Sequence, residues 1–389
     1  SLTPLLKGKV EINYISLEDL EVNTRDIIPD IYIDGKVGYA RVVVRDADLA
    51  NAVADIRQLH IADTDLNIVL ADTTASEESE PLPWIINLHS GRINNSSINL
   101  ALPYDTLNAG IHIERLLLNR GSINLLESSF AAKELALGNS IIEYDRGDDI
   151  PEQAPLDHIK LRDININAKD LRYANINDIS ADITDFTFEQ PDGIAITDAA
   201  VHFTSSKESL QLHRLEIASR NGSRISAQST IPQTAVQTPM DECLSATLVA
   251  NINKPDLARL VPQSTYQSLD IFDRELLNAV VALSGRIYDI NIDTIAVEFP
   301  GVGAVNANGN IKEILDADGR KANIALNAVV DDITTFTGYS NDSIDGKVNA
   351  DGIILYGNGE IEINEDYQAP MGPFMLLLTN MLPFIIILL

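Results

Sequence analysis

The sequence predicts an all-β fold, an elongated and curled (taco-like) β-sheet groove of stacked hairpin repeats with an apolar interior. Apolar residues alternate with polar residues along many short segments, which is the period of a strand with one buried face. A motif of two apolar pairs separated by a short polar stretch recurs along the chain, and long helical patterns are nearly absent. These observations favour one sheet built from small repeating units.

Two segments show the alternation most clearly. Every second residue is apolar between positions 244 and 252, and residues 324–330 repeat the pattern. Apolar side chains at alternate positions point to one face of a strand. The residues expected to line the groove are Ile12, Leu66, Ile68, Ile98, Leu100, Leu116, Leu118, Ile123, Leu125, Phe186, Phe188, Leu244, Ala246, Leu248, Ala250, Ile252, Ile324, Leu326, Ala328 and Val330.

The recurring motif is clearest in IERLLLNRGSINL, residues 113–125, and residues 56–68 place apolar side chains at the same offsets. The motif predicts a hairpin, and its three-residue slip in the alternation predicts a bulge or bend. One hairpin with one apolar face is only marginally stable in water, so neighbouring hairpins must stack. About two dozen candidate strands, ~4.8 Å apart, would form a sheet ~110 Å long.

The sequence divides into four segments. Residues 1–254 are expected to form a repeated β-hairpin groove, 255–277 a short helical interruption, 278–365 a continued β-groove, and 366–389 an apolar, membrane-associated segment. Asp256 is the candidate N-cap of a short helix in the second segment.

The last sixteen residues, FMLLLTNMLPFIIILL, carry no charge. As a helix they would span ~24 Å, short of the ~30 Å hydrocarbon core, and Pro383 would kink them. Either a membrane-embedded helix or a segment buried against a partner or inside the groove fits this pattern. The residues expected to contact the membrane are Phe374, Leu376, Leu377, Leu378, Phe384, Ile385, Ile386 and Ile387.

The charge of the chain argues against a nucleic-acid partner. There are 57 acidic and 28 basic residues, a formal net charge of −29, so phosphate backbones repel the chain. Its single cysteine, Cys243, has apolar neighbours, which predicts a buried and inert thiol.

Patterns of catalytic, cofactor and metal sites are missing from the sequence. The six histidines form no metal-spaced pair, and His112 and His202 lie between apolar residues, so each is expected on the polar face of its strand. No nucleophile elbow, phosphate loop or dinucleotide fingerprint occurs. We therefore expect no enzyme, no cofactor and no metal site. A lining of Ile, Leu, Val and Ala suits flexible hydrocarbon chains.

The repeats resemble the TamB branch of the AsmA-like proteins, a family of bridge-like lipid transfer proteins, in the long form found in Bacteroidota. The resemblance rests on LLKGKVEINYISLEDLEVNT (5–24), on the recurring motif, and on IDTIAVEFPGVGAVNANGNI (292–311), and it covers most of residues 1–365. The chain is much shorter than full members of the family, which indicates a fragment.

The resemblance implies a non-enzymatic conduit for phospholipid acyl chains between the inner and outer membranes, which supports outer-membrane biogenesis. It also implies a periplasmic location, an inner-membrane anchor, and an outer-membrane barrel of the TamA/BamA type as partner, as in a translocation and assembly module. Two alternatives stay open. One is an assembly chaperone that offers strand edges to nascent outer-membrane proteins, and the other is a passive solenoid whose groove is packed by its own side chains.

Overall fold

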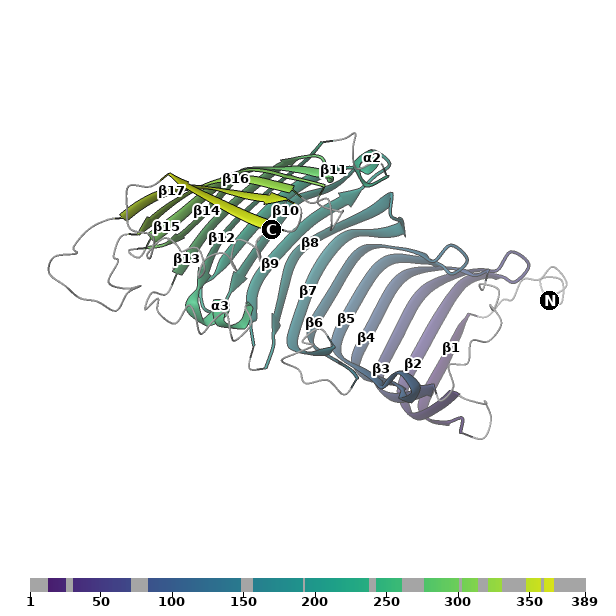
Figure 1. Ribbon diagram of the computed structural model, residues 1–389. Coiled ribbons are helices and arrows are strands. Elements are labelled where there is room, and N and C mark those ends of the chain that lie inside the picture. Colours follow the sequence, from purple (N-terminus) through teal and green to yellow (C-terminus); the bar gives the residue numbers. More distant parts are fainter. Residues whose placement is uncertain are drawn as a thin grey trace. The chain divides into compact units, whose positions relative to one another are not determined.

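The chain forms two compact units, unit 1 (Ser1–His202) and unit 2 (Phe203–Leu389), and the boundary lies within strand β9 (Ala195–Ser205). The computed structural model describes residues 13–25, 31–70, 83–147, 157–191, 193–237, 243–260, 276–300, 303–313, 321–330, 348–357 and 360–366. The predicted all-β, curled-sheet fold class is confirmed, because strands make up nearly all of these residues (Figure 1). The division of the sequence into four segments stays a prediction.

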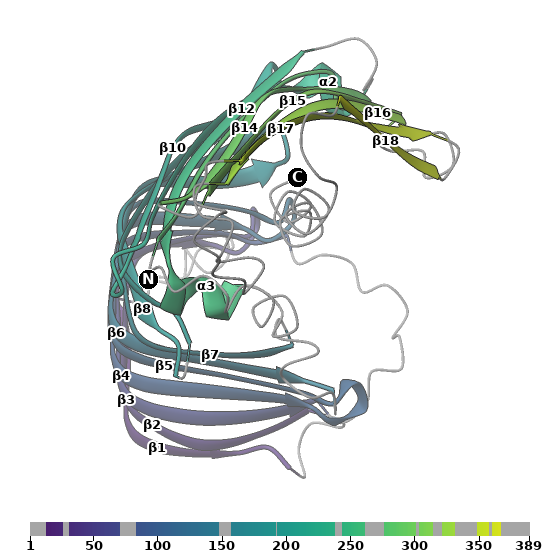
Figure 2. The same cartoon turned by 60° about the vertical axis from the view of Figure 1, so that its left-hand side comes forward.

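Unit 1 is a sheet of long strands that follow one another in chain order. From β2 to β7 every strand is 18 residues long, and Figures 1 and 2 show these strands bending along their length. Successive strands pair antiparallel, except that β3 and β4 pair parallel. The strands are β1 (Tyr14–Asn23), β2 (Ile31–Asp48), β3 (Val53–Leu70), β4 (Ile85–Leu102), β5 (Leu107–Asn124), β6 (Ser129–Arg146), β7 (His158–Asn175) and β8 (Asp178–Glu189), with a 3₁₀ turn η1 (Pro103–Asp105) before β5.

Unit 2 has shorter strands, each antiparallel to the next. They are β10 (Ser209–Ser219), β11 (Arg224–Pro232), β12 (Leu244–Asn253), β13 (Leu276–Gly285), β14 (Asp289–Phe299), β15 (Gly303–Lys312), β16 (Lys321–Val330), β17 (Val348–Gly357) and β18 (Glu360–Asp366).

Two short helices belong to unit 2, α2 (Gln233–Gln237) after β11 and α3 (Lys254–Leu260) after β12. Helix α3 lies at the start of the segment 255–277, where the sequence predicts short helices. Among the residues that the structure describes, no helix has the length and apolar character needed to cross a membrane.

The recurring motif forms one long strand in β5, so the hairpin predicted for residues 113–125 is wrong. Strand β5 continues through Gly121 to Asn124, and residues 56–68 likewise lie inside β3. Pairing with β4 on one side and β6 on the other extends over the whole length of β5, and these hydrogen bonds outweigh a local turn preference. Residues 212–227, by contrast, do contain a hairpin turn, between β10 and β11.

Left-handed residues occupy the slips in the alternation. Asp63, Asn95 and Asn139 have φ of 48°, 41° and 49°, and Asp and Asn adopt this conformation more readily than other residues with a Cβ. Asn95, for example, lies between Ile93 and Ser96, whose register partners Leu116 and Ile113 also stand three residues apart. The irregularity predicted at the slips is therefore present, and it keeps the apolar side chains on one face along the whole strand.

Candidate functional site

The register of unit 1 gathers its apolar side chains into rows on one face, which we call the inner face. One row contains register partners from β3 to β7: Ile61, Ile93, Leu116, Leu137 and Ile166. Because partners in a ladder lie on the same face of a sheet, the row forms a continuous apolar strip across five strands.

The residues of the inner face are most buried in the row next to this strip. Thr64, Ser96 and Ser140 occupy equivalent positions there, directly after the left-handed residues Asp63, Asn95 and Asn139, and all three are buried. Each hydroxyl donates to the carbonyl two residues earlier in its own strand, at 2.7–3.2 Å. These bonds satisfy the three buried hydroxyl groups within their own strands.

Exposure rises from this buried row, the floor of the inner face, to the rim. Ser140 and Ile164, paired on the floor, are 0% and 1% exposed, whereas Ile123 and Phe130, paired near the strand ends, are 47% and 50% exposed. A flat sheet would expose its middle as much as its edges. The gradient therefore shows that the inner face is the concave side of the bent sheet, and we call this concavity the trough.

Among the described residues, the predicted lining residues of unit 1 fall on the inner face, with Leu125 as the exception. Leu125 follows the last residue of β5 and lies in the turn before β6. Phe186 is the register partner of Ile166, and its ring centroid lies 5.2 Å from that of Phe188. The remaining members are in the ladders of β3, β4 and β5: Leu66, Ile68, Ile98, Leu100, Leu116, Leu118 and Ile123.

Unit 2 has an inner face of a different kind, because its apolar side chains are covered. The register partners Ala250, Ala279, Val297 and Val305 form a row from β12 to β15, and all four are at most 2% exposed. Ile252 and Ile324 are also buried. The predicted lining residues Leu244, Ala246 and Leu248 lie in the same strand, β12, as register partners of Gly285, Leu283 and Val281.

Some predicted residues cannot be placed. Leu326, Ala328 and Val330 pair through their backbones with Ala307, Val305 and Gly303 of β15. Ile12 lies outside the described residues, and so do all the expected membrane contacts: Phe374, Leu376, Leu377, Leu378, Phe384, Ile385, Ile386 and Ile387.

Two sequence predictions about single residues are wrong. Cys243 is exposed, because it precedes β12 and is out of phase with the apolar positions that begin at Leu244. Asp256 is not an N-cap but lies in the first turn of α3.

The Asp256 carboxylate is buried, and it ties α3 to the turn between β10 and β11. Ser219 and Ser223 donate to Oδ2, and Asn221 donates to Oδ1 at 2.7 Å. Burial acts to raise the pKa of Asp256, but the three donors outweigh it and hold the pKa below its ordinary value. The sequence shows these partners only as separate polar residues more than thirty positions away.

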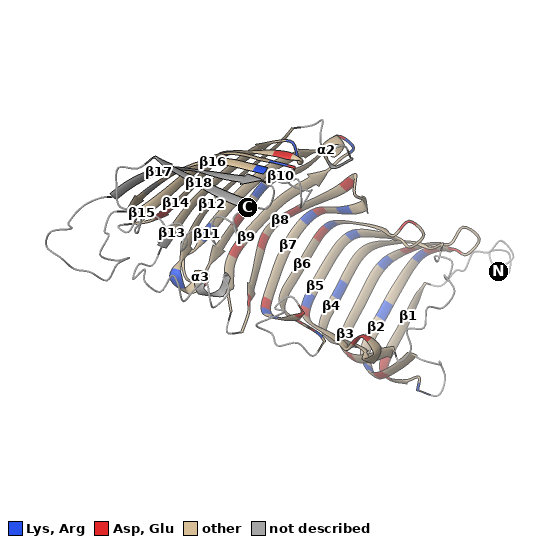
Figure 3. Cartoon of the chain, in the orientation of Figure 1, with Lys and Arg blue, Asp and Glu red and all other residues tan. Residues whose placement is uncertain are grey.

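The outer face of unit 1 carries the charges, and acidic and basic residues are interspersed over its strands (Figure 3). Many are paired: Lys36 with Asp19, Lys133 with Asp170, Lys160 with Glu143 and Arg172 with Asp178. His112 lies on this face as predicted, with Nδ1 2.9 Å from Ser97 Oγ. His158 differs from a solvated histidine, since only 13% of its side chain is exposed and Nδ1 contacts Asp145.

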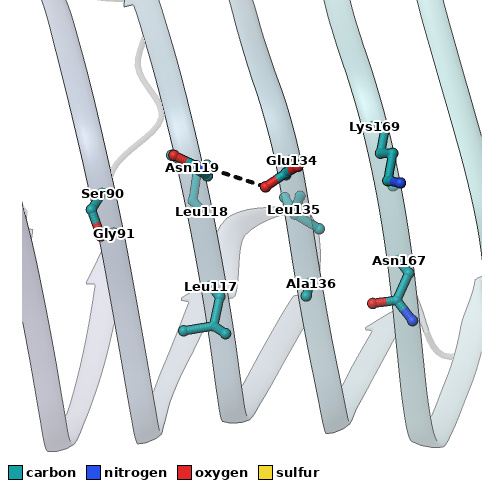
Figure 4. Close-up of a pocket in the computed structure, with 11 residues that line it drawn as sticks. Ser90, Gly91, Leu117, Leu118, Asn119, Glu134, Leu135, Ala136, Asn167 and Lys169 are labelled. Carbon is teal, nitrogen blue, oxygen red and sulfur yellow. Dashed lines mark hydrogen bonds between the residues drawn. The ribbon is translucent and has the colours of Figure 1, made fainter.

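A shallow hollow of about 390 Å³ opens on the outer face over β4 to β7 (Figure 4). Its floor includes Leu117 and Ala136, which are register partners, and Asn119 donates to Glu134 at 2.9 Å beside them. Leu118 and Leu135 are their neighbours in sequence but belong to the inner face, behind the strands in Figure 4. The sequence contains no sign of this hollow, because it forms from two or three residues of each of four strands.

Fold and site together define a class: an all-β protein whose first unit presents an open apolar trough on one face and a charged surface on the other. Three or more His, Cys, Asp or Glu side chains do not gather into a metal-binding group anywhere in the described ranges. The sequence matches no protein-family model, and no characterised protein is significantly similar to it.

Proposed function

We propose that the chain is a non-enzymatic conduit for phospholipid acyl chains, with the trough of unit 1 as the conducting surface. The supporting observation is the exposure gradient of the inner face, from a buried floor at Ser140 to an uncovered rim at Ile123 and Phe130. An exposed apolar surface of this extent in a water-soluble unit indicates an apolar ligand. Phospholipid head groups would stay at the wet rim while their acyl chains lie on the floor.

The energetics suit hydrocarbon chains. Burial gains ~0.8 kcal/mol per methylene, so a chain of about ten methylenes would gain roughly 8 kcal/mol before entropic costs. The interaction is non-directional, because the trough residues are Ile, Leu, Val and Phe and the floor hydroxyls are bonded to their own backbone. Such a surface holds acyl chains without fixing their position, as a conduit requires.

The wider setting is part of the same proposal: a periplasmic chain between the inner and outer membranes, with an inner-membrane anchor and an outer-membrane barrel of the TamA/BamA type as partner. It rests on the resemblance described from the sequence. The buried inner face of unit 2, with Ala279 and Val297 at 1% exposure, fits the alternative of a face packed by protein side chains. Conduction is therefore proposed for unit 1 alone.

A photocrosslinker placed on either face of one strand tests the proposal. Ile123 and Ser122 are adjacent in β5 and point to opposite faces, since their partners on β4 are Ile86 and Asn87. We expect phospholipid adducts from a photoreactive residue at Ile123 and none from Ser122, together with phospholipid in gently purified protein. Equal labelling at the two positions, or no phospholipid in either experiment, would reject the conduit.

A second candidate function, an assembly chaperone for outer-membrane strands, is favoured by β1. Ile15, Leu17 and Leu20 lie on the inner face of this strand and are 40–48% exposed. Photocrosslinking from Ile15 to an unfolded outer-membrane protein, with no lipid adduct at Ile123, would support the chaperone over the conduit.

A further inference from the structure

The outer hollow of unit 1 is bordered by unpaired cations. Arg92 is the register partner of Leu117 in the floor, and Arg115 lies two residues before Leu117 on the same face of β5. Lys169 belongs to the lining itself, on β7, but it stands between two carboxylates, its register partners Glu134 on β6 and Asp182 on β8. The cations without such partners are therefore Arg92 and Arg115, from β4 and β5, beside Leu117 at one end of the floor.

These cations lack the carboxylate partners that other cations on this face have. In the part of the chain that the structure describes, Arg92 and Arg115 make no ion pair and no side-chain hydrogen bond, whereas Lys133 and Lys160 are paired on the neighbouring strands. Glu134 is the acidic residue of the lining; Asn119 donates to it, and Lys169 is its register partner. Two positive charges without a carboxylate partner therefore lie beside the hollow, in a chain whose net charge is −29.

A third cation lies in the same row of the sheet. Arg41 on β2 and Arg92 on β4 are both register partners of His60 on β3, so the two arginines stand two strands apart. Arg41 contacts the Tyr14 ring, 5.1 Å from its centroid, and has no carboxylate partner in the described residues. It adds to the positive charge on this side of the hollow.

The floor of the hollow restricts which anionic ligand can bind beside these cations. Leu117 is 36% exposed and lies against Ala136, so part of the ligand must be apolar to cover it. The guanidinium groups of Arg92 and Arg115 suit the oxygen geometry of phosphate groups. The negative charge of the whole chain opposes extended polyanions, but a compact anion can still be held locally.

We propose that this hollow binds a phosphate ester with a short apolar group, with Arg92 and Arg115 around the phosphate and Leu117 and Ala136 under the apolar group. The inference does not rest on lipid conduction, because the hollow and the trough lie on opposite faces of the sheet. Either a soluble phosphate ester or the head-group region of a lipid could supply this chemistry.

Calorimetric titration of the full chain tests the site, with hexyl phosphate, inorganic phosphate and hexanol as probes. We expect saturable binding of hexyl phosphate, weaker binding of inorganic phosphate, and no hexanol binding that depends on Arg92 or Arg115. Each of Arg92→Gln and Arg115→Gln should weaken hexyl phosphate about tenfold, as expected for the loss of one charge-assisted contact. Leu117→Asn should remove the preference for hexyl phosphate over inorganic phosphate. Short-chain phosphatidic acid, titrated in parallel, distinguishes a lipid source from a soluble one.

Two variants serve as controls, Lys160→Gln and Lys133→Gln. Both are outer-face cations already paired with a carboxylate, Glu143 and Asp170, so neither change should alter the titration. Circular dichroism establishes that each variant is folded, and all the substituted cations are exposed. The proposal is wrong if hexyl phosphate does not saturate, or if Arg92→Gln and Arg115→Gln bind it like the unchanged chain.

Discussion

Truncating one isoleucine in each unit tests whether the trough is open in unit 1 and the inner face is closed in unit 2. Ile123 on β5 and Ile295 on β14 are both inner-face isoleucines, but Ile123 is 47% exposed and Ile295 is 0% exposed. The change to Ala removes the same atoms at both sites. Any difference in unfolding free energy therefore comes from the surroundings of the side chain.

The exposures set the expected magnitudes. Truncation of a fully buried isoleucine loses the transfer free energy and leaves a cavity, which costs ~2–5 kcal/mol, so we expect a loss in this range for Ile295→Ala. At Ile123 about half of the side chain already contacts water, no closed cavity can form, and the loss should be under ~1 kcal/mol.

Urea unfolding followed by two probes separates the units. Trp84, the single tryptophan, accepts a backbone hydrogen bond from Leu125 at 2.9 Å and reports on unit 1, whereas circular dichroism reports on all strands. The two units can unfold in separate transitions, so the unfolding free energy of each is fitted on its own. Equal destabilisation at the two sites, or a larger loss at Ile123, would refute the open trough.

Three other substitutions or measurements test single features. The pKa of Asp256 is lower in the folded protein, so its carboxylate should stabilise the fold above the unfolded carboxyl pKa of ~3.9. This stabilisation should be lost as the pH falls through the folded pKa. Asp256→Asn should therefore cost ~1–3 kcal/mol of unfolding free energy at pH 7 and make that free energy less dependent on pH in the acid range. An unchanged profile in urea titrations at several pH values would count against this role. Asn139→Val should destabilise by ~1–2 kcal/mol because of the left-handed backbone, and Asn139→Gly should not; thermal unfolding measures both, and equal losses would contradict the argument. Cys243 should react with a maleimide in the native protein at the rate of an exposed thiol, and reaction only after unfolding would contradict its exposure.

Much of the fold follows from local sequence, because alternation reports directly which face of a strand is buried. The slips also predict a backbone irregularity, since a phase change in a continuous strand needs one residue that departs from the regular pleat, here the left-handed Asp63, Asn95 and Asn139. Whether a slip becomes such an irregularity or a turn is not decided locally. NRGS at 119–122 lies inside β5 with Arg120 left-handed, whereas RNGS at 220–223 forms the turn between β10 and β11. Nearly the same four residues give both outcomes, and the length of the neighbouring strands decides between them.

Of the candidate sites too, some could be predicted from local sequence and others could not. The trough could be predicted because its residues share one property and recur at fixed spacing. The outer hollow could not, because Arg92, Leu117, Glu134 and Lys169 come together only through the register of four strands. The Asp256 cluster depends on contacts between α3 and a turn more than thirty residues away, so the sequence favoured the common capping role instead.

The slips explain how one sheet can present two different chemistries. Each slip in β3, β4 and β6 places a left-handed Asp or Asn where the strand bends and a small hydroxyl residue directly after it, on the inside of the bend. A small side chain fits the crowded inside of the bend, and its hydroxyl donates to the carbonyl two residues earlier in the strand. Beyond the bend the apolar side chains resume on the same face, so the trough continues on both arms of the strand. The polar side chains meanwhile stay together on the outer face, where unpaired cations can collect around Leu117 without contact with the trough.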